Sequence, residues 1–399
     1  MSEWMKKHKR KIDFRLPSKY DLWLHLAVLV LLVFGTIMIT SASMGATANT
    51  SGSMVVYKTL IKQSIFVFIS YAMMIFFAKC FTLQRARDYG KIIGIIILTL
   101  LIATLFFDDM NTGSKSWIRI GGFSLQPSEF VKVYLVIMMA VSVGIAGRRN
   151  FDFWTIVKTP IMFLIIFSII ILLQPDFGTL AIIIMICGVC FLIPSHVNLR
   201  KYQHKALIII GILSVILIFA MTPQGLKLLE KLPLFGYQIK RFEASVNPLS
   251  DPYNTSYQLL HGLYAIALGG FFGVGLGNSI QKFGFLTQAS SDYILAIVIE
   301  ELGLFGFMVV LVGYIVIIQR LLHYAFLTKN ESYKVILVGT SMYIFIHFVI
   351  NVGGISGLIP LTGVPLLFIS SGGSALLSIM VAIGICQGVI SRIRHQGET

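Results

Sequence analysis

The chain has 399 residues, of which 56% are hydrophobic and only 12% are charged, and its mean hydropathy is +0.85. This composition excludes an ordinary soluble globular domain. Because several apolar runs reach the roughly 20 residues that cross a bilayer, the sequence predicts an all-α polytopic membrane protein. The formal net charge of +15 then indicates basic cytoplasmic loops and contact with anionic lipid, with no nucleic acid as partner.

About ten apolar stretches are candidates for transmembrane helices. Basic residues concentrate in alternate connections between them, which places both termini in the cytoplasm by the positive-inside rule. The first stretch follows a basic segment without an obvious cleavage site, so we expect it to be retained as a helix. The predicted spans are 22–42, 59–78, 91–107, 129–147, 156–173, 178–194, 205–222, 293–320, 333–357 and 368–391.

These spans form a single membrane domain, predicted over residues 22–391, between two short tails. We expect residues 1–21 to be a basic cytoplasmic segment and residues 392–399 a cytoplasmic tail. Between the seventh and eighth spans, residues 223–292 form a large extracytoplasmic loop, which is too long to be a mere connection. Within it, residues 257–277 are apolar and glycine-rich without being a clean span, which favours a re-entrant or interfacial helix.

Three predicted helix starts on the outer side carry an acidic residue: Glu129, Asp176 and Asp292. One interpretation is helix capping, because a carboxylate suits the positive end of a helix. Ser, Thr or Asn would cap as well, so carboxylates at all three ends also indicate a polar site at the membrane surface. Asp292 stands at the polar-to-apolar boundary itself, one residue before a long hydrophobic run.

Basic residues accompany these carboxylates. Lys115 and Arg119 lie on either side of Trp117 in a polar connection, and Lys132 lies inside an apolar run three residues after Glu129. Lys132 can pair with Glu129 on the same helix face. Alternatively, the three cations hold an anionic head group such as a pyrophosphate at the outer surface.

Two further features lie deeper in the predicted membrane region. Glu300 is about two helical turns beyond Asp292 on the same face, where a carboxylate either pairs with a cation or faces a polar cavity. Residues 351–374 are rich in Gly and Pro and contain no charged residue, which predicts broken helix before the last span. Broken backbone at membrane depth is tolerated where it lines a cavity, and its free N–H groups can bind an anion.

Other kinds of site find no support in the sequence. Cys187 and Cys190 form a C-x-x-C within a hydrophobic run, which favours helix packing over a metal or redox site. The histidines show no metal-ligand spacing, and no nucleotide-binding motif or nucleophile elbow occurs. We therefore predict no organic cofactor and no metal site made by the protein alone.

The ordered motifs together resemble the SEDS family (shape, elongation, division and sporulation) over about residues 20–391. The resemblance implies the ten-span fold and a peptidoglycan glycosyltransferase. Such an enzyme polymerises lipid II, an undecaprenyl-pyrophosphate-linked disaccharide-peptide, into glycan strands on the outer face of the bacterial cytoplasmic membrane. The motifs that carry it are Gly113–Ile118, Gln126–Glu129, Gln174–Thr179, Tyr257–Gln258, Gly269–Gly277, Ser291–Tyr293, Glu300–Gly303, Gly363–Pro365 and Ser370–Ser374.

The resemblance also implies roles for individual residues. The essential aspartate of the family falls on Asp292, which would be the general base. A divalent cation, Mg or Mn, can assist the leaving pyrophosphate beside the basic residues. Ser116 stands where the family often has Arg. The expected substrate-binding residues are Lys115, Trp117, Arg119, Gln126, Ser128, Glu129, Lys132, Asp176, Thr179, Gln258, Glu300, Ser370, Gly372, Gly373 and Ser374.

The expected partners are lipid II, a class B penicillin-binding protein that cross-links the strands, and other divisome membrane proteins. The run Gly277–Lys282 resembles the division member of the family, which acts at the septum, more than the elongation member. Two interpretations from other classes stay open. A lipid II flippase would need a polar path open to both membrane faces. A non-catalytic scaffold would tolerate changes at the motif residues.

Overall fold

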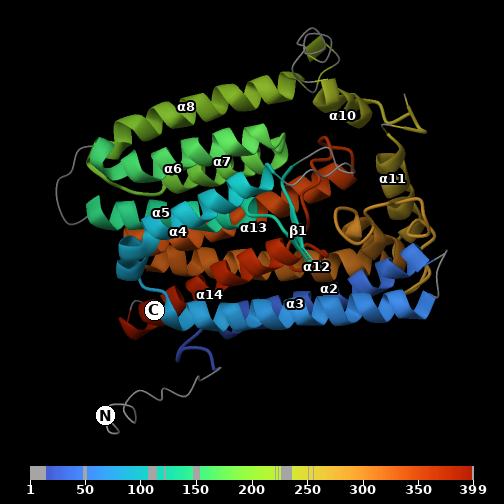
Figure 1. The fold of residues 1–399 in the computed structure, drawn as a ribbon, viewed down its shortest axis with the longest axis horizontal. Coiled ribbons are helices and arrows are strands. Elements are labelled where there is room, and N and C mark those ends of the chain that lie inside the picture. The colour runs from blue at the N-terminus through green and yellow to red at the C-terminus, as the bar shows by residue number, and fades with distance from the viewer. Residues whose placement is uncertain are drawn as a thin grey trace.

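Each of the ten predicted spans falls on a helix in the computed structural model, and these helices run side by side in one bundle (Figure 1). They are α2 (Leu22–Ser43), α3 (Gly52–Cys80), α4 (Leu83–Thr104), α5 (Ser128–Ala146), α6 (Phe153–Leu173), α7 (Phe177–Leu192), α8 (Val197–Ala220), α12 (Ile294–Leu327), α13 (Glu331–Ile355) and α14 (Gly373–His395). Among the described residues, seven helices are long and apolar enough to cross a membrane, and α7 is a shorter apolar helix. The chain is a polytopic helical membrane protein.

Shorter elements complete the chain. They are the 3-10 helix η1 (Met44–Thr47), the antiparallel strands β1 (Ile118–Ile120) and β2 (Phe123–Leu125), α10 (Gly236–Val246) and α11 (Tyr257–Gly269). The structure describes residues 15–47, 52–106, 115–120, 123–146, 153–220, 222, 224–225, 236–249, 251–254 and 256–397. Most of the predicted N-terminal segment and parts of the two predicted outer loops lie outside these ranges.

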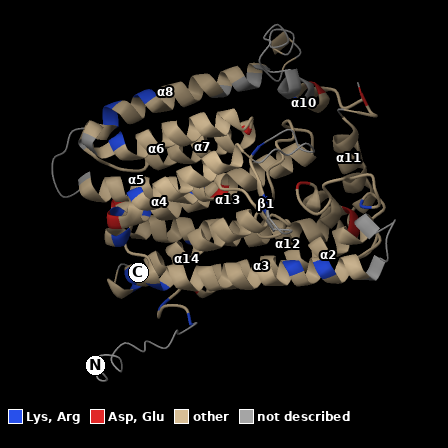
Figure 2. Cartoon of the chain, in the orientation of Figure 1, with Lys and Arg blue, Asp and Glu red and all other residues tan. Residues whose placement is uncertain are grey.

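The two ends of the bundle differ in their short elements and in their content of Lys and Arg. In Figure 1 the two ends of the described chain, the start of α2 and the end of α14, lie at one end of the bundle, and α10 and α11 lie at the opposite end. Lys and Arg gather at the end with the termini (Figure 2). This arrangement agrees with cytoplasmic termini and an outer face formed by the loop with α10 and α11, although the orientation across the membrane stays a prediction.

Helix α14 is the centre of the bundle, and most of its residues are buried. Among the helices that it contacts, α14 packs most extensively against α3. Gly384 and Gly388, one turn apart, allow this approach, because a β-carbon on either would overlap a backbone carbonyl of α3, at Met74 and Ala78 respectively. Small residues at this spacing are how membrane helices pack closely without a hydrophobic driving force between them.

Replacing Gly384 with Val is expected to destabilise the bundle by at least about 1–3 kcal/mol, because backbone atoms cannot move aside as a side chain can. Gly211→Val is the matched control, since a β-carbon at Gly211 on α8 meets no atom within 4 Å. Thermal unfolding in detergent measures both. Equal melting temperatures for the two variants would show that the α3–α14 contact is not close-packed in the membrane.

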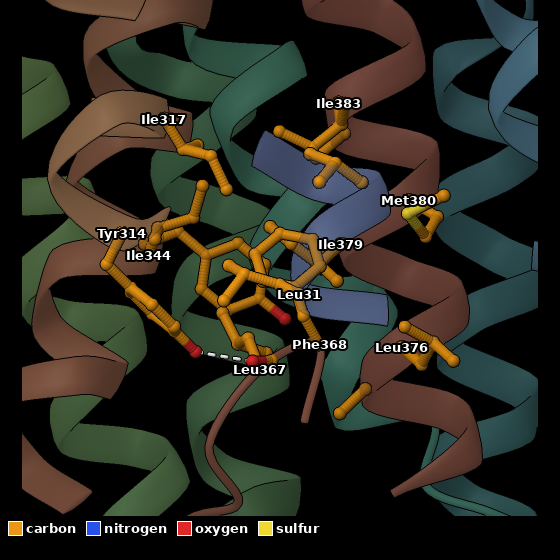
Figure 3. Close-up of a cluster of buried hydrophobic side chains, with 14 of the residues drawn as sticks. Leu31, Tyr314, Ile317, Ile344, Leu367, Phe368, Leu376, Ile379, Met380 and Ile383 are labelled. Atoms are coloured by element: carbon orange, nitrogen blue, oxygen red, sulfur yellow. Dashed lines mark hydrogen bonds between the residues drawn. The ribbon is translucent and has the colours of Figure 1, made fainter. Parts of the chain in front are cut away.

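The backbone between α13 and α14 is irregular and reaches into the bundle, as the glycines and prolines predict. Gly35 of α2 faces the backbone of Phe368 and Ile369, about 12 Å inward from the end of that helix. Tyr314 of α12 donates a hydrogen bond to the carbonyl of Leu367 within a cluster of buried apolar side chains (Figure 3). Helix α14 therefore starts at Gly373 rather than at residue 368, because Phe368 has a φ of +69°.

Helix α12 is also broken. Gly303 has φ 63° and ψ −155°, which are not helical angles. The glycine-rich stretch after α11 fills the break: Val274 N–H donates to Glu300 O, and Gly275 N–H donates to Glu301 O, both at 2.9 Å. These bonds satisfy carbonyl groups that the break would leave unpaired in an apolar environment. The segment 257–277 is therefore a short helix followed by a loop that packs into α12.

At the end of the bundle with the termini, a buried carboxylate joins three helices. Asp21 caps α2 by accepting from Leu24 N–H at 2.7 Å. It also pairs with Arg320 of α12 at 2.6 Å and with Arg394 of α14 at 3.1 Å. Gln387 of α14 makes reciprocal hydrogen bonds with the backbone of Asp21, at 2.9 and 3.0 Å. The first and last long helices are thus fastened together directly.

Candidate active site

Asp292 is held by its backbone, which leaves its carboxylate available. The N-cap of α12 is Tyr293, and no side chain caps that helix end, so Asp292 does not have the capping role that was one alternative. Asn351 of α13 donates from its Nδ2 to Asp292 O and to Val364 O, both at 3.0 Å. The amide therefore fixes the start of α12 to the irregular segment before α14.

The surroundings of the Asp292 side chain come from two other parts of the chain. A β-carbon at Gly363 would stand 3.6 Å from Asp292 Oδ2, which is van der Waals contact, so the backbone of Gly363 lies next to the carboxylate. Arg241 of α10 donates from Nη1 to Leu361 O at 2.6 Å, and its charge acts on Asp292. The large outer loop thus places a cation beside the predicted base.

The electrostatic environment of Asp292 suits a general base. Burial raises the pKa of this carboxyl to about 6, although a hydrogen bond from Ser291 and the charge of Arg241 oppose that rise. The side chain remains partly exposed, so a substrate group can reach it. A carboxylate with a pKa near the working pH accepts a proton more readily than an ordinary aspartate and is still largely ionised at neutral pH.

Replacing Arg241 with Gln is expected to move the acidic limb of the activity profile to higher pH. The base acts when ionised, so activity falls as pH drops through the pKa of Asp292, and loss of a nearby positive charge raises that pKa. Initial rates of polymerisation between pH 5 and 8 would show the shift. The control is Arg87→Gln, which removes an exposed charge that pairs with Asp88. An unmoved limb would mean that Arg241 does not act on the ionising group.

Asp176 and Gln126 join two helix starts close to Asp292. Asp176 caps α7 by accepting from Thr179 N–H at 3.0 Å, and Gln126 Nε2 donates to its other oxygen at 3.1 Å. The backbone N–H of Gln126 donates to Ser374 Oγ at 3.2 Å. Gly178 lies against Thr362, within the same irregular segment that contacts Asp292. Capping is thus one role of Asp176, and the carboxylate also belongs to the cluster.

Lys132 and Glu129 form a buried ion pair, with Nζ and Oε1 2.7 Å apart and side chains that are 1% and 2% exposed. The other oxygen of Glu129 accepts from the Tyr343 hydroxyl at 2.9 Å. Lys132 Nζ also lies 2.9 Å from His347 Nε2, and His347 Nδ1 lies 3.2 Å from Pro365 O. The pairing interpretation of Lys132 is therefore correct in this structure. Through His347 and Pro365, the network also contacts the irregular segment before α14.

Glu300 holds the loop that leads to Asp292. Its side chain is fully buried, and it accepts hydrogen bonds from Ser279 Oγ at 2.5 Å and from Ile280 N–H at 2.8 Å. The next residue, Glu301, pairs with Lys282 at 2.7 Å and accepts from Ser41 of α2. Glu300 thus contacts loop backbone and a hydroxyl rather than a cation or an open cavity.

The remaining predicted residues lie around these groups. Arg119 lies in strand β1 of the β1–β2 hairpin, which contacts α14, and Lys115 lies just before it; both are exposed, and Trp117 is half-buried. Ser128, Ser370 and Gly373 are buried near the N-terminal end of α14, and Gly372 is its N-cap. Gln258 of α11 donates to Thr287 at 2.6 Å, beside the loop that leads to Asp292. The described residues contain no group of three or more His, Cys, Asp or Glu that could hold a metal.

The comparisons with known proteins agree with this arrangement. A family model described as a cell cycle protein, covering FtsW, RodA and SpoVE, matches residues 22–396. The chain is a SEDS protein. It is 32% identical to the probable peptidoglycan glycosyltransferase FtsW of Bacillus subtilis over 96% of this chain and 93% of that one. It is also 33% identical to the FtsW of Lactococcus lactis over 84% of each chain, and 32% identical to the stage V sporulation protein E of B. subtilis over 94% and 98%.

Two solved structures share the SEDS fold. One belongs to a study of polymerization and crosslinking by a peptidoglycan synthase complex, with a TM-score of 0.71 and 20% identity over 95% of this chain and 99% of that one. The other is the rod shape determining protein RodA of Thermus thermophilus, with a TM-score of 0.60 and 19% identity over the same shares. At this identity they confirm the polytopic helical fold of the SEDS protein.

Sequence reasoning missed three residues of the site. Arg241 lies in a long loop with no pattern that marks it, and Asn351 was only the first residue of a glycine-rich run. His347 was set aside because it has no metal-ligand spacing, yet it is fully buried beside Lys132. The intramembrane lysine was the available signal, because a buried cation needs several polar neighbours.

Proposed function

We propose that this SEDS protein is a peptidoglycan glycosyltransferase that polymerises lipid II into glycan strands. The observation that carries the proposal is Asp292, a partly exposed carboxyl with its pKa raised to about 6, at the meeting point of α10, α12 and the segment before α14. The FtsW relatives named above are called probable peptidoglycan glycosyltransferases, and the chain matches them along nearly its whole length.

In the proposed reaction, a sugar hydroxyl of one substrate attacks the anomeric carbon of another. Asp292 accepts the hydroxyl proton as the new glycosidic bond forms. The bond to the undecaprenyl-pyrophosphate breaks at the same carbon, and the leaving group takes the bonding electron pair. Asn351 keeps the carboxylate in position by holding the backbone of Asp292, and Gly363 lies next to the carboxylate.

The negative charge of the leaving group needs stabilisation. Lys115 and Arg119 are the exposed cations of the hairpin, and Arg241 adds a third near Asp292. A divalent cation such as Mg²⁺, when bound, would supply further positive charge to the phosphates, and such an ion needs only one or two protein carboxylates. Asp292 and Asp176 are the carboxylates of the candidate site that could hold it.

The partner and the location follow from the same proposal. A class B penicillin-binding protein would cross-link the strands, and other divisome membrane proteins would recruit the pair to the septum. The FtsW relatives favour a role in division over one in elongation. We propose an orientation with both termini in the cytoplasm, so that Asp292 and the α10–α11 region face the outer surface where the strands are made.

The test uses the purified protein with its cognate penicillin-binding protein, lipid II and Mg²⁺ or Mn²⁺. Glycan strands of increasing length on a gel are the expected result. The same protein in vesicles with fluorescent lipid II reports transfer between leaflets. Transfer without any strands would refute the polymerase and support the flippase, whereas neither product would favour a scaffold.

A further inference from the structure

Side chains hold the backbone of the irregular segment that runs beside Asp292. Residues 361–367 belong to no helix or strand, so their carbonyl groups lack the partners that regular structure supplies, and a buried carbonyl group without a partner costs free energy. Donors come instead from other elements: Arg241 of α10 to Leu361 O, Asn351 of α13 to Val364 O and Tyr314 of α12 to Leu367 O (Figure 3). The neighbour of Pro365 O is His347 of α13.

His347 lies between a cation and a carbonyl group. Its Nε2 is 2.9 Å from Lys132 Nζ, and its Nδ1 is 3.2 Å from Pro365 O. An ammonium group only donates hydrogen bonds and a carbonyl oxygen only accepts them. Nε2 therefore carries the lone pair that accepts from Lys132, and Nδ1 carries the proton that is donated to Pro365 O. The two neighbours fix one tautomer of a neutral imidazole.

The cation on the far side of the ring is itself held in place. Lys132 Nζ lies 2.7 Å from Glu129 Oε1, and the Tyr343 hydroxyl donates to Glu129 Oε2 at 2.9 Å. The Tyr343 ring also meets the His347 ring edge-on, with 4.8 Å between centroids. All four side chains are buried. The imidazole therefore has a fixed orientation as well as a fixed tautomer, which is how outer partners usually prepare a histidine for its role.

His347 and Asn351 act on neighbouring points of the segment. They lie one helical turn apart on the same face of α13, and they bond the carbonyl groups of residues 364–365. Asn351 also donates to Asp292 O, and the backbone of Gly363 lies next to the Asp292 carboxylate. The backbone on one side of the predicted base is therefore held from α13 at two consecutive carbonyl groups.

We propose that His347, as a neutral imidazole with its proton on Nδ1, is a positioning residue for glycosyl transfer. By holding Pro365 O, it keeps the backbone at Gly363 beside the carboxylate of Asp292. The proposal rests on the proposed function, because it assigns His347 to the reaction in which Asp292 accepts a proton. His347 exchanges no proton itself. A displacement of about 1 Å near the reacting atoms costs about 10² in rate, so its contribution is to kcat rather than to substrate affinity.

Two amide substitutions separate the two bonds of the imidazole. In His347→Asn, the amide N–H stands close to the position of Nδ1 and can still donate to Pro365 O, but the side chain is too short to reach Lys132. In His347→Gln, the amide oxygen stands close to the position of Nε2 and can accept from Lys132, whereas the bond to Pro365 is lost. The first variant keeps the hold on the segment, and the second keeps the partner of the buried cation.

Activity and stability are expected to change in opposite order. His347→Gln should lose about tenfold in kcat with KM nearly unchanged, and it should melt close to the wild type. His347→Asn should keep kcat within about threefold of the wild type and melt at a lower temperature, because Lys132 loses an acceptor. If His347 only stabilised the fold, activity would follow the melting temperature. The same two substitutions at His323, which is exposed on α12, are the controls and should change neither.

Strand formation at varied lipid II, with the cognate penicillin-binding protein, gives kcat and KM, and thermal unfolding in detergent gives stability. Solid-state NMR of the full-length protein in lipid bilayers, with ¹⁵N-labelled histidine, measures the tautomer, and the spectrum of His347→Gln assigns the signals by difference. A protonated Nδ1 and an unprotonated Nε2 are expected. The opposite tautomer, or a ring with both protons, would overturn the inference.

The kinetic outcomes separate this inference from the proposed function. Strands from the wild type and from His347→Gln at equal kcat would refute the inference alone, and so would a His347→Asn protein that is folded but less active than His347→Gln. If His347→Asn does not fold, the kcat of His347→Gln and the NMR spectrum still decide. Wild-type protein that makes no strands would refute the proposed function, and the role of His347 in it would be refuted too, even with the expected tautomer.

Discussion

Replacing Asp292 with Asn is expected to lower the rate of strand formation about 10²–10⁴-fold while the protein stays folded. The substitution keeps the shape of the side chain and the backbone carbonyl that accepts from Asn351. It removes the group that takes the proton. Strand formation from lipid II on a gel measures the rate, and thermal unfolding measures the fold.

Asp88→Asn is the control for this substitution, because Asp88 lies half-exposed on α4 in a surface ion pair. It should polymerise at the wild-type rate. If the Asp292→Asn protein retained more than about a tenth of that rate, Asp292 would not be the base. If its melting temperature fell sharply, Asp292 would have to be regarded as structural.

Replacing Glu301 with Ala is expected to destabilise the protein by about 3–5 kcal/mol, because it leaves the charge of Lys282 buried without a partner. Both side chains of this ion pair are 0% exposed. Activity should fall too, since the loop between Lys282 and Asp292 loses its attachment to α2 and α12. Thermal or denaturant unfolding in detergent, together with strand formation, would measure both effects.

The double variant Lys282→Met with Glu301→Leu separates charge from shape. It removes both charges at similar volume, and such replacements are often tolerated, so it should be more stable than Glu301→Ala. The control is Glu331→Ala, whose pair with Lys334 is partly exposed and 3.5 Å apart, and which should change stability by less than about 1 kcal/mol. A double variant as unstable as Glu301→Ala would show that packing, rather than the ion pair, holds the loop.

The fold was largely predictable because each span is a long apolar run, and a bilayer allows few structures for such a run. The break in α12 could not be predicted from the sequence. A single glycine inside an apolar helix gives no signal by itself, and the reason for the break is a partner far away in sequence. The loop at 273–275 supplies the N–H groups that Glu300 and Glu301 need, and only the folded chain brings them together.

The presence of a polar site was predictable from the sequence, but its full set of residues was not. The motif residues Gln126, Asp176 and Asp292 do converge on the first turn of α14 and the segment before it. For Lys132, the sequence left pairing and phosphate binding open, and the structure shows the pair. Arg241 could not be found, because it lies on a short helix, α10, within the long predicted loop, and no motif in the sequence links that helix to Asp292.

The cluster around Asp21 has a consequence for how the protein is made. Asp21 is synthesised before the helices that carry its two partners, Arg320 on α12 and Arg394 on α14. Until those helices are made, the carboxylate lacks both guanidinium partners and must stay hydrated. A chain that stops short of Arg394 therefore leaves the buried Asp21 carboxylate with Arg320 as its only guanidinium partner, and the joint between α2 and α14 loses its ion pair.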